Sequence, residues 1–203
     1  MTDTLIPMTR ADRDNPVVLS KIYTRTGDDG TTALGDMSRT RKTDPRLAAY
    51  ADVEEANAAI GVALAVGSLD EDVTEVLTRI QNELFDVGAD LCTPIVDHPE
   101  FPPLRVEPSY IEWLEARCDE FNERLRPLRS FILPGGTPAV AQLHVARTVA
   151  RRAERTVWSA LEAHGDLNPL TAKYLNRLSD LLFILCRIAA HGEEILWKPG
   201  GTR

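Results

Sequence analysis

The sequence predicts an all-α protein: a five-helix bundle preceded by a short extended N-terminal loop. Apolar residues recur at spacings of three and four in five successive segments, which is the period of an amphipathic helix. Prolines, N-cap residues and glycines mark the ends of these segments, and most connections between them are short. The 203 residues, of which 43% are hydrophobic and 27% charged, can fill one core and cover it.

The N-terminal region differs from the rest of the chain. Residues 1–18 are polar and aperiodic, which predicts a flexible tail, and residues 19–203 are expected to form a single helical-bundle domain. Two short stretches of β-favouring residues, 21–24 and 31–34, flank the turn sequence Gly-Asp-Asp-Gly at 27–30. We therefore expect an extended loop with a tight turn before the first helix.

The first two helices follow from periodicity. The first begins near Pro45 and ends near Gly67. Its inward side is predicted to carry Leu47, Tyr50, Val53, Asn57, Ile60 and Leu64. The second helix is predicted from the spacing of Val73, Val76, Leu77, Ile80, Leu84, Val87 and Leu91.

The last three helices have clearer boundaries. The third carries Ile111, Leu114, Cys118, Phe121 and Leu125, and we expect Pro127 to end it. Thr137 followed by Pro138 is typical of an N-cap and first turn, so the fourth helix should run to about Ala163. Asn168 and Pro169 open the fifth helix, which we expect to end at Gly192.

Composition excludes several functions. The net charge of −8 argues against nucleic-acid binding. The three cysteines lie too far apart for a zinc cluster or a disulfide framework, so we expect them to be small buried apolar groups: Cys92, Cys118 and Cys186. The four histidines have no metal-binding spacing. Without an apolar run of about 18 residues or a signal peptide, the chain is expected to be cytoplasmic and not membrane-bound.

The segment from Thr24 to Thr32 carries the first chemical signal. Gly27 and Gly30 allow successive backbone N–H groups to converge on an anion, and Arg25 with the threonine hydroxyl groups adds further phosphate ligands. The segment lacks the lysine of a Walker A loop. The alternative is an ordinary turn made of common turn residues.

A row of arginines on the fourth helix is the second signal. Arg147, Arg151 and Arg155 are four residues apart, so their side chains share one side of the helix. Their mutual repulsion requires an anion, which is either a nucleotide triphosphate or carboxylates such as Glu154 and Glu54. The alternative is a solvated helix face with ion pairs.

Polar residues interrupt the apolar fifth helix at Asn176, Arg177, Ser179 and Asp180. Asn176 is placed to reach a ribose or phosphate, and Asp180 to pair with an arginine of the fourth helix. The alternative is a buried polar network that fixes helix register.

The apolar loop Phe131–Gly136 lies between proline and glycine residues. Such a loop either closes the end of the bundle or lines the site of a large apolar ligand.

Five motifs occur in the order found in one known family, which the chain resembles from about Lys21 to Gly192. The family is the PduO-type ATP:cob(I)alamin adenosyltransferases. The motifs are Lys21–Gly30, Lys42–Arg46 with Ala49–Tyr50, Phe131–Thr137, Arg151–Arg155 and Asn176–Asp180.

This resemblance implies a homotrimer of five-helix bundles that binds ATP between neighbouring subunits. One wall of the ATP site would come from the N-terminal loop and comprise Thr24, Arg25, Thr26, Gly27, Thr32, Ala33 and Lys42. The other wall would come from the adjacent subunit and comprise Arg151, Arg152, Glu154, Arg155 and Asn176.

The resemblance also assigns three further residues. Phe131 would sit under the corrin ring of cobalamin and keep the lower axial ligand off cobalt. Glu54 would pair with Arg147 across the subunit interface. Two positions depart from the family pattern: Glu54 replaces an aspartate, and Ala51 replaces the glycine that usually follows Tyr50.

The reaction implied by the resemblance is attack of cob(I)alamin on C5′ of ATP, with release of triphosphate. Arg151, Lys42 and Mg²⁺ carried by ATP would stabilise the leaving polyanion, and no protein side chain is assigned as a metal ligand. A cobalamin reductase and an adenosylcobalamin-dependent mutase are the expected partners. Two alternatives are a non-catalytic nucleotide- or cobalamin-binding trimeric carrier on the same fold and a purely structural bundle.

Overall fold

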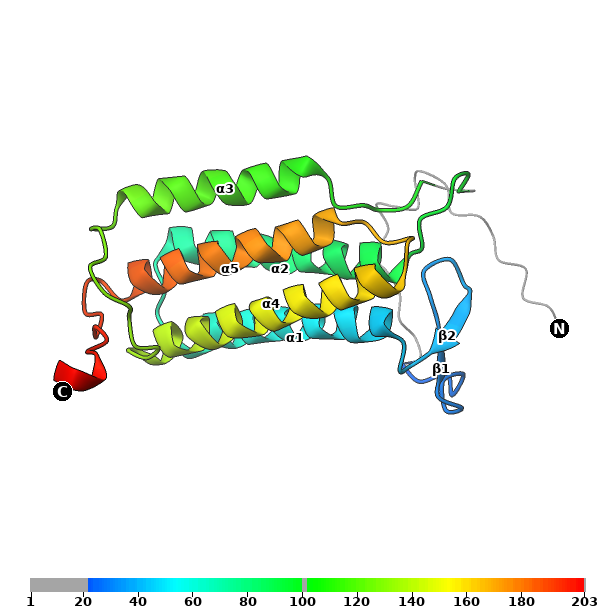
Figure 1. Cartoon of the computed structure of the whole chain (residues 1–203), viewed down its shortest axis with the longest axis horizontal. Coiled ribbons are helices and arrows are strands. Elements are labelled where there is room, and N and C mark those ends of the chain that lie inside the picture. Colours follow the sequence, from blue (N-terminus) through cyan, green and yellow to red (C-terminus); the bar gives the residue numbers. More distant parts are fainter. Residues whose placement is uncertain (1–21, 100–101, 203) are drawn as a thin grey trace.

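Five long helices lie side by side in the computed structural model, which describes residues 22–99 and 102–202 (Figure 1). The helices are α1 (Pro45–Val66), α2 (Glu71–Cys92), α3 (Pro108–Glu123), α4 (Pro138–Ala163) and α5 (Leu170–Ala189). The all-α prediction is confirmed. The tail predicted for residues 1–18 lies outside the described residues.

Local sequence signals account for the helix ends. The Asp44 side chain accepts a hydrogen bond from the Arg46 backbone N–H and caps α1, while Thr137 caps α4 in the same way. The third helix ends at Glu123, before the predicted stop at Pro127, and the fifth ends at Ala189 rather than at Gly192. In the third helix the backbone tightens before the proline. There the Leu125 N–H donates to the Asn122 carbonyl at 3.0 Å, an i to i−3 bond.

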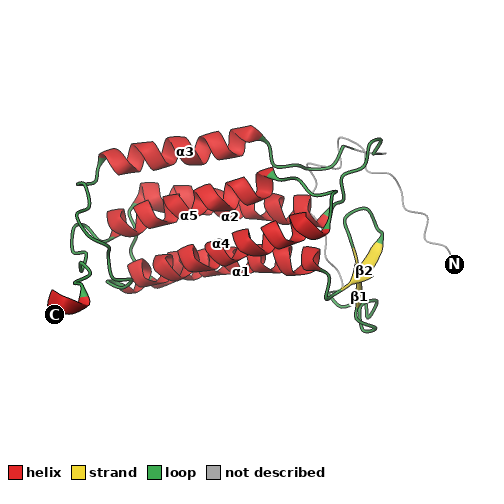
Figure 2. Cartoon of the chain, in the orientation of Figure 1, coloured by secondary structure: helices red, strands yellow, loops and turns green. Residues whose placement is uncertain are grey.

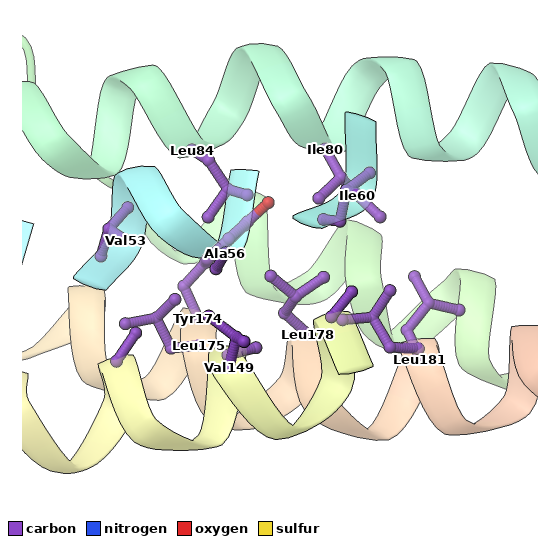
Figure 3. Close-up of a cluster of buried hydrophobic side chains, with 14 of the residues drawn as sticks. Val53, Ala56, Ile60, Ile80, Leu84, Val149, Tyr174, Leu175, Leu178 and Leu181 are labelled. Carbon is purple, nitrogen blue, oxygen red and sulfur yellow. The ribbon is translucent and has the colours of Figure 1, made fainter. Parts of the chain in front are cut away.

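Helix α4 occupies the centre of the packing. It makes its main contacts with α1 and α5, while α2 packs against α1 and α3 covers α5. Figure 3 shows the apolar centre of this arrangement. Its labelled side chains are Val53, Ala56, Ile60, Ile80, Leu84, Val149, Tyr174, Leu175, Leu178 and Leu181. The Tyr174 hydroxyl in this core donates to Glu83 at 2.9 Å, so the buried polar tip is satisfied.

A buried carboxylate fastens the long α2–α3 connection to the bundle. Asp90 is 0% exposed. Its two oxygens accept hydrogen bonds from Arg105 Nη1 at 2.6 Å, from the Val106 N–H at 2.7 Å and from Asn168 Nδ2 at 2.7 Å. Because a buried charge is tolerated only when it is paired, these three donors hold the loop and the start of α5 in place.

A two-stranded hairpin lies at the end of the bundle where α1 begins (Figure 2). Strand β1 (Thr31–Ala33) pairs antiparallel with β2 (Arg39–Arg41), and Thr32 lies opposite Thr40. The strand expected at residues 31–34 is therefore present. The stretch before the Gly27–Gly30 turn is not a strand over residues 22–24, because β1 pairs with the downstream segment instead.

Within the described residues, no helix has the length and hydropathy needed to cross a membrane. The cysteine prediction is correct for Cys186, which is buried, and burial raises the pKa of its thiol to about 12. It is wrong for Cys92 and Cys118, which are only partly buried.

Candidate functional site

The N-terminal loop is organised by its own polar groups. The Gly30 N–H donates to the Gly27 carbonyl at 3.2 Å, which forms the predicted turn, and Gly30 has a φ of 81°. Asp29 accepts from the Thr31 hydroxyl at 2.7 Å and the Thr31 N–H at 3.0 Å. These hydrogen bonds hold the pKa of Asp29 below its ordinary value. Thr24 and Thr26 lie in hydrogen-bond contact at 2.9 Å, and their side chains are exposed.

Lys42 lies against this loop. A Cβ atom added to Gly27 would lie 3.1 Å from Lys42 Nζ, so glycine leaves the room that the ammonium group occupies. Next to it is a hollow of ≈ 380 Å³ at the start of α1. The hollow is lined by Thr32, Lys42, Thr43, Asp44, Leu47, Ala48, Tyr50 and Ala51. Of the residues predicted for one wall, the structure thus brings Gly27, Thr32 and Lys42 together, and the hollow is not lined by the other four, Thr24, Arg25, Thr26 and Ala33.

The three arginines of the α4 row differ in their surroundings. Arg151 and Arg155 are exposed, and among the described residues neither forms an ion pair. Arg147 is half-buried, its Nε has no hydrogen-bond partner, and its guanidinium carbon lies 5.9 Å from the centre of the Phe183 ring. The alternative of a face laced with ion pairs does not describe these three arginines within the chain.

Other polar residues beside the row find partners. Arg152 forms ion pairs with Glu55 and with Asp52 of α1, so it joins α1 to α4. Asn176 donates to Glu154 at 3.0 Å, which brings the predicted α5 residue to the arginine side of α4.

The expected partner of Asp180 was wrong. Its carboxylate pairs with Arg177 at 2.5 Å on its own helix rather than with an arginine of α4. The two residues are three apart, and side chains at this spacing are neighbours on a helix surface. Glu54 is exposed on α1, and within the chain it forms no ion pair with Arg147.

The Phe131 loop lies at the opposite end of the bundle and does not plug it. The Phe131 side chain is 78% exposed. Behind the loop is a hollow of ≈ 450 Å³, lined by Ile132–Thr137, by Glu193–Ile195 and by side chains that include His144 and Cys186. His144 is almost fully buried, and burial together with the nearby Arg147 charge lowers its pKa. An exposed aromatic residue above an apolar hollow suits a large flat apolar ligand.

Two anchors at the N-terminal-loop end were not predicted from sequence. His164 at the end of α4 contacts Asp44 at 2.8 Å, and the buried Arg46 binds Asp166 at 2.5 Å. Burial raises the pKa of Asp44, but hydrogen bonds from Arg46, Thr40 and His164 outweigh this effect, so its pKa is lowered. These contacts fix the segment that carries Lys42 beside the C-terminus of α4. No local sequence pattern predicts these contacts, because 120 residues separate His164 from Asp44 and the two meet only in the folded chain.

The two candidate regions of one chain are therefore far apart. Phe131 precedes the N-terminus of α4, and Lys42 is held near its C-terminus (Figure 1). A helix of 26 residues is about 39 Å long at 1.5 Å per residue. Arg151 lies near the middle of α4. Within one chain, the N-terminal loop and Phe131 cannot touch the same small group of reacting atoms.

Fold and site together define a helical-bundle protein with exposed arginines on α4 and a separate hollow beside an exposed aromatic residue. Comparison with known proteins gives the family. The family model described as cobalamin adenosyltransferase matches residues 22–189. The chain belongs to this family, and it is an enzyme of the corrinoid adenosyltransferase class.

Individual relatives agree with this assignment. A corrinoid adenosyltransferase of Mycobacterium tuberculosis is 63% identical over 188 residues, which are 92% of this chain and 97% of the relative. One of Mycobacterium leprae is 61% identical over 187 residues, covering 90% and 98%. Among solved structures, a variant PduO-type ATP:corrinoid adenosyltransferase from Lactobacillus reuteri, complexed with cobalamin and ATP, superposes with a TM-score of 0.81. It is 35% identical, and the match covers 88% of this chain and all of that one.

Proposed function

We propose that this chain transfers the 5′-deoxyadenosyl group of ATP to cob(I)alamin at sites formed between neighbouring subunits of a homotrimer. The N-terminal loop of one subunit and the α4 surface of the next would form the two walls of each site. The observation that carries this proposal is that, within one chain, Phe131 and the Lys42 loop lie at opposite ends of α4, about 39 Å apart, and Arg151 lies about 18 Å from the Lys42 end. Assembly is what brings complementary walls together.

The N-terminal loop would bind the nucleotide. The hydroxyls of Thr24 and Thr26 and the Arg25 side chain are exposed and suited to phosphate oxygens, whereas the Gly30 and Thr31 N–H groups donate within the loop. Lys42, held against Gly27, adds a positive charge at the same place. Thr32 and Ala33 lie on the adjoining strand β1, and Thr32 lines the hollow next to Lys42.

The α4 surface would hold the triphosphate from the other side. Arg151 and Arg155 carry unpaired charges at one face, and each charge-assisted hydrogen bond to phosphate contributes about 1.5–3 kcal/mol. Glu154 and Asn176 orient each other through their hydrogen bond. Arg152 is paired with Glu55 and Asp52 in the free chain, so contact with ATP would require it to exchange these carboxylates for phosphate.

The chemical step needs charge and alignment from the protein rather than a general base. The cob(I)alamin cobalt donates its electron pair to C5′ of ATP while the C5′–O bond breaks, and that bond's electrons leave with the triphosphate. Holding the two substrates in line supplies on the order of 7–11 kcal/mol of the barrier. Arg151 and Lys42 stabilise the negative charge that develops on the leaving group.

Mg²⁺ would reach the site with ATP. Among the described residues, no three His, Cys, Asp or Glu side chains gather to hold a metal ion. Bound to the triphosphate, the ion would add charge neutralisation, and we assign it no protein ligand.

Phe131 would contact the lower face of the corrin ring. An exposed apolar ring offers cobalt no ligand atom, so cobalamin bound over it would lose its lower axial ligand and become four-coordinate. Loss of that ligand eases reduction of Co(II) to the attacking Co(I) state. We assign Glu54 and Arg147 to an ion pair between subunits, because each lacks an ion-pair partner in its own described chain.

The proposal also extends to the setting of the enzyme. We place it in the cytoplasm, where a reductase would supply Co(I) and an adenosylcobalamin-dependent mutase would take the product. Neither partner is identified by a surface of this chain.

An anaerobic turnover assay tests the activity. The protein is mixed with chemically reduced cobalamin, ATP and Mg²⁺, the cob(I)alamin spectrum is followed, and released triphosphate is assayed. We expect adenosylcobalamin and triphosphate in equal amounts. If ATP binds without product, the protein is a non-catalytic carrier. If ATP does not raise the unfolding temperature either, the nucleotide site itself is wrong.

A further inference from the structure

The C-terminal segment after α5 forms a short antiparallel ladder with the Phe131 loop. The Trp197 N–H donates to the Phe131 carbonyl at 2.7 Å, and the Leu133 N–H donates to the Ile195 carbonyl at 2.8 Å. Ile132 and Leu196 form the bridge between these bonds. The Ser130 hydroxyl closes the ladder by donating to the Trp197 carbonyl at 2.9 Å. The family match ends at residue 189, so this partner segment lies beyond it.

The ladder brings two aromatic rings together. The centres of the Phe131 and Trp197 rings lie 6.1 Å apart with an interplanar angle of 67°, an inclined pair of the favourable kind. Phe131 is 78% and Trp197 41% exposed. An aromatic side chain with so little packing around it would otherwise occupy several rotamers. The Trp197 contact is the aromatic contact that restricts it.

Core packing does not support the loop from behind. The ≈ 450 Å³ hollow lies on its inner side, so the loop has room to collapse inward. The C-terminal segment is fixed at its base instead. Arg187 of α5 pairs with Glu194 at 2.8 Å, and its Nη2 donates to the Arg126 carbonyl at 2.8 Å. Both groups of the Arg187–Glu194 ion pair are largely buried, so the pair holds the start of the C-terminal segment in place.

We propose that Trp197 is a positioning residue for adenosyl transfer: the ladder fixes its backbone, and its ring holds Phe131 in the orientation that meets the corrin. This proposal rests on the proposed function of Phe131. Trp197 acts on cobalt only through Phe131, and its removal should leave the nucleotide walls unaffected, because these lie elsewhere along the bundle.

The test uses the full chain with ATP and Co(II) cobalamin, and it measures the four-coordinate fraction by electron paramagnetic resonance, together with kcat and the KM for ATP. In Trp197→Ala the four-coordinate fraction and kcat should each fall several-fold, with the KM for ATP within about twofold of wild type. Trp197→Phe, which retains an aromatic ring, should restore most of both. Trp158→Ala removes a tryptophan of similar exposure from α4 and is the matched control.

Two further variants separate the possible failures. If Phe131→Ala leaves the cobalt spectrum unchanged, the proposed function of Phe131 is wrong. If Phe131→Ala changes the spectrum and Trp197→Ala does not, the positioning role of Trp197 is overturned. The double variant should match Phe131→Ala alone, since Trp197 acts through that ring; an additional loss in the double variant would contradict this route.

Discussion

Four arginines of α4 lie within three helical turns, yet their surroundings differ. Arg152 is paired with two carboxylates of α1, whereas Arg151 and Arg155 are exposed and have no ion pair among the described residues. Like charges four residues apart destabilise a helix by about 0.2–0.5 kcal/mol per pair. The chain nevertheless keeps these like charges on one face of α4. A bound polyanion converts this repulsion into a favourable interaction. Arg151 and Arg155 are therefore better candidates than Arg152 for contacts with the triphosphate.

Arg151→Ala should nearly abolish turnover. Loss of one preorganised donor to a developing charge lowers kcat by roughly 10²- to 10³-fold. Single-turnover kinetics with reduced cobalamin measure the effect. Arg124→Ala removes an arginine that pairs with Asp72 on a distant part of the surface, and it should retain normal activity. Near-normal turnover in Arg151→Ala would remove Arg151 from the leaving-group role.

His144 should make the protein less stable in mild acid. Burial and the neighbouring Arg147 lower its pKa from the ordinary 6.5, so the folded state holds the neutral imidazole while the unfolded chain takes up a proton. Below about pH 6.5, unfolded molecules therefore bind more protons than folded ones. The free energy of unfolding decreases as the pH is lowered from about 6.5 to the lowered pKa of His144 in the folded state. Arg187 and Glu194 line the same hollow, where they form an ion pair with each other.

Thermal unfolding about one pH unit above and below 6.5 measures this effect. The difference in Tm between the two conditions should be smaller in His144→Asn than in the wild type. His98→Asn, in the exposed α2–α3 connection, is the control. Equal pH dependence in His144→Asn and wild type would show that His144 is not the group responsible.

At the scale of elements, the sequence predicts what local signals specify. Helices α1 and α4 begin where Asp44 and Thr137 cap them and end at or next to their predicted ends, whereas α3 and α5 end before the predicted Pro127 and Gly192. The pairing of β1 with β2 was not predictable in the same way, because an exposed three-residue strand has no pattern that selects its partner. The contacts of Asp90, Asp180 and His164 likewise depend on which loops and turns meet after folding.

The candidate site also contains some residues that the sequence identifies and others that only the folded structure identifies. Gly27 and the arginine row could be recognised from residue type and spacing, whereas Lys42 was assigned through the family resemblance; the structure brings Lys42 to Gly27. The role of Trp197 has no such signal, because a tryptophan near the end of a chain gives no indication of the loop it contacts. The Arg152 ion pairs required knowledge that α1 packs against α4.

Removal of the Asp90 carboxylate should destabilise the whole bundle. Asp90→Ala leaves Arg105, the Val106 N–H and Asn168 without their common acceptor, and breaking a buried ion pair from one side costs about 3–5 kcal/mol. Urea unfolding measures the loss in free energy of unfolding. Asp97→Ala removes an exposed carboxylate from the same connection and should change it by less than about 0.5 kcal/mol. A similarly small change in Asp90→Ala would show that the loop does not depend on this contact.

At the scale of the whole molecule, one chain carries two halves of the proposed site that face different neighbours. The loop with Lys42 lies at the C-terminal end of α4, while Arg151 lies near its middle and Phe131 beyond its N-terminus. Subunits that contact one another head to tail close into a ring, and every interface of that ring then contains one loop and one arginine surface. The proposed trimer therefore has three equivalent sites, each built from two chains.

This arrangement predicts complementation between two inactive variants. Lys42→Ala damages the loop wall and Arg151→Ala the α4 wall. The two variants are co-expressed with different tags, and trimers that carry both tags are purified. Each mixed trimer then holds one site with an intact Lys42 from one chain and an intact Arg151 from its neighbour. Turnover should recover to about one third of wild type, since one interface of three is complete.

The uniform trimers of each variant are the controls, and both should remain nearly inactive. If each site were formed within a single chain, every site in a mixed trimer would still lack either Lys42 or Arg151, and mixing would restore nothing. Recovery is therefore specific to a site shared between subunits. Light scattering on the mixed species provides the subunit number that the expected fraction assumes, and a dimer would raise that fraction to about one half of wild type because one interface of two would be complete.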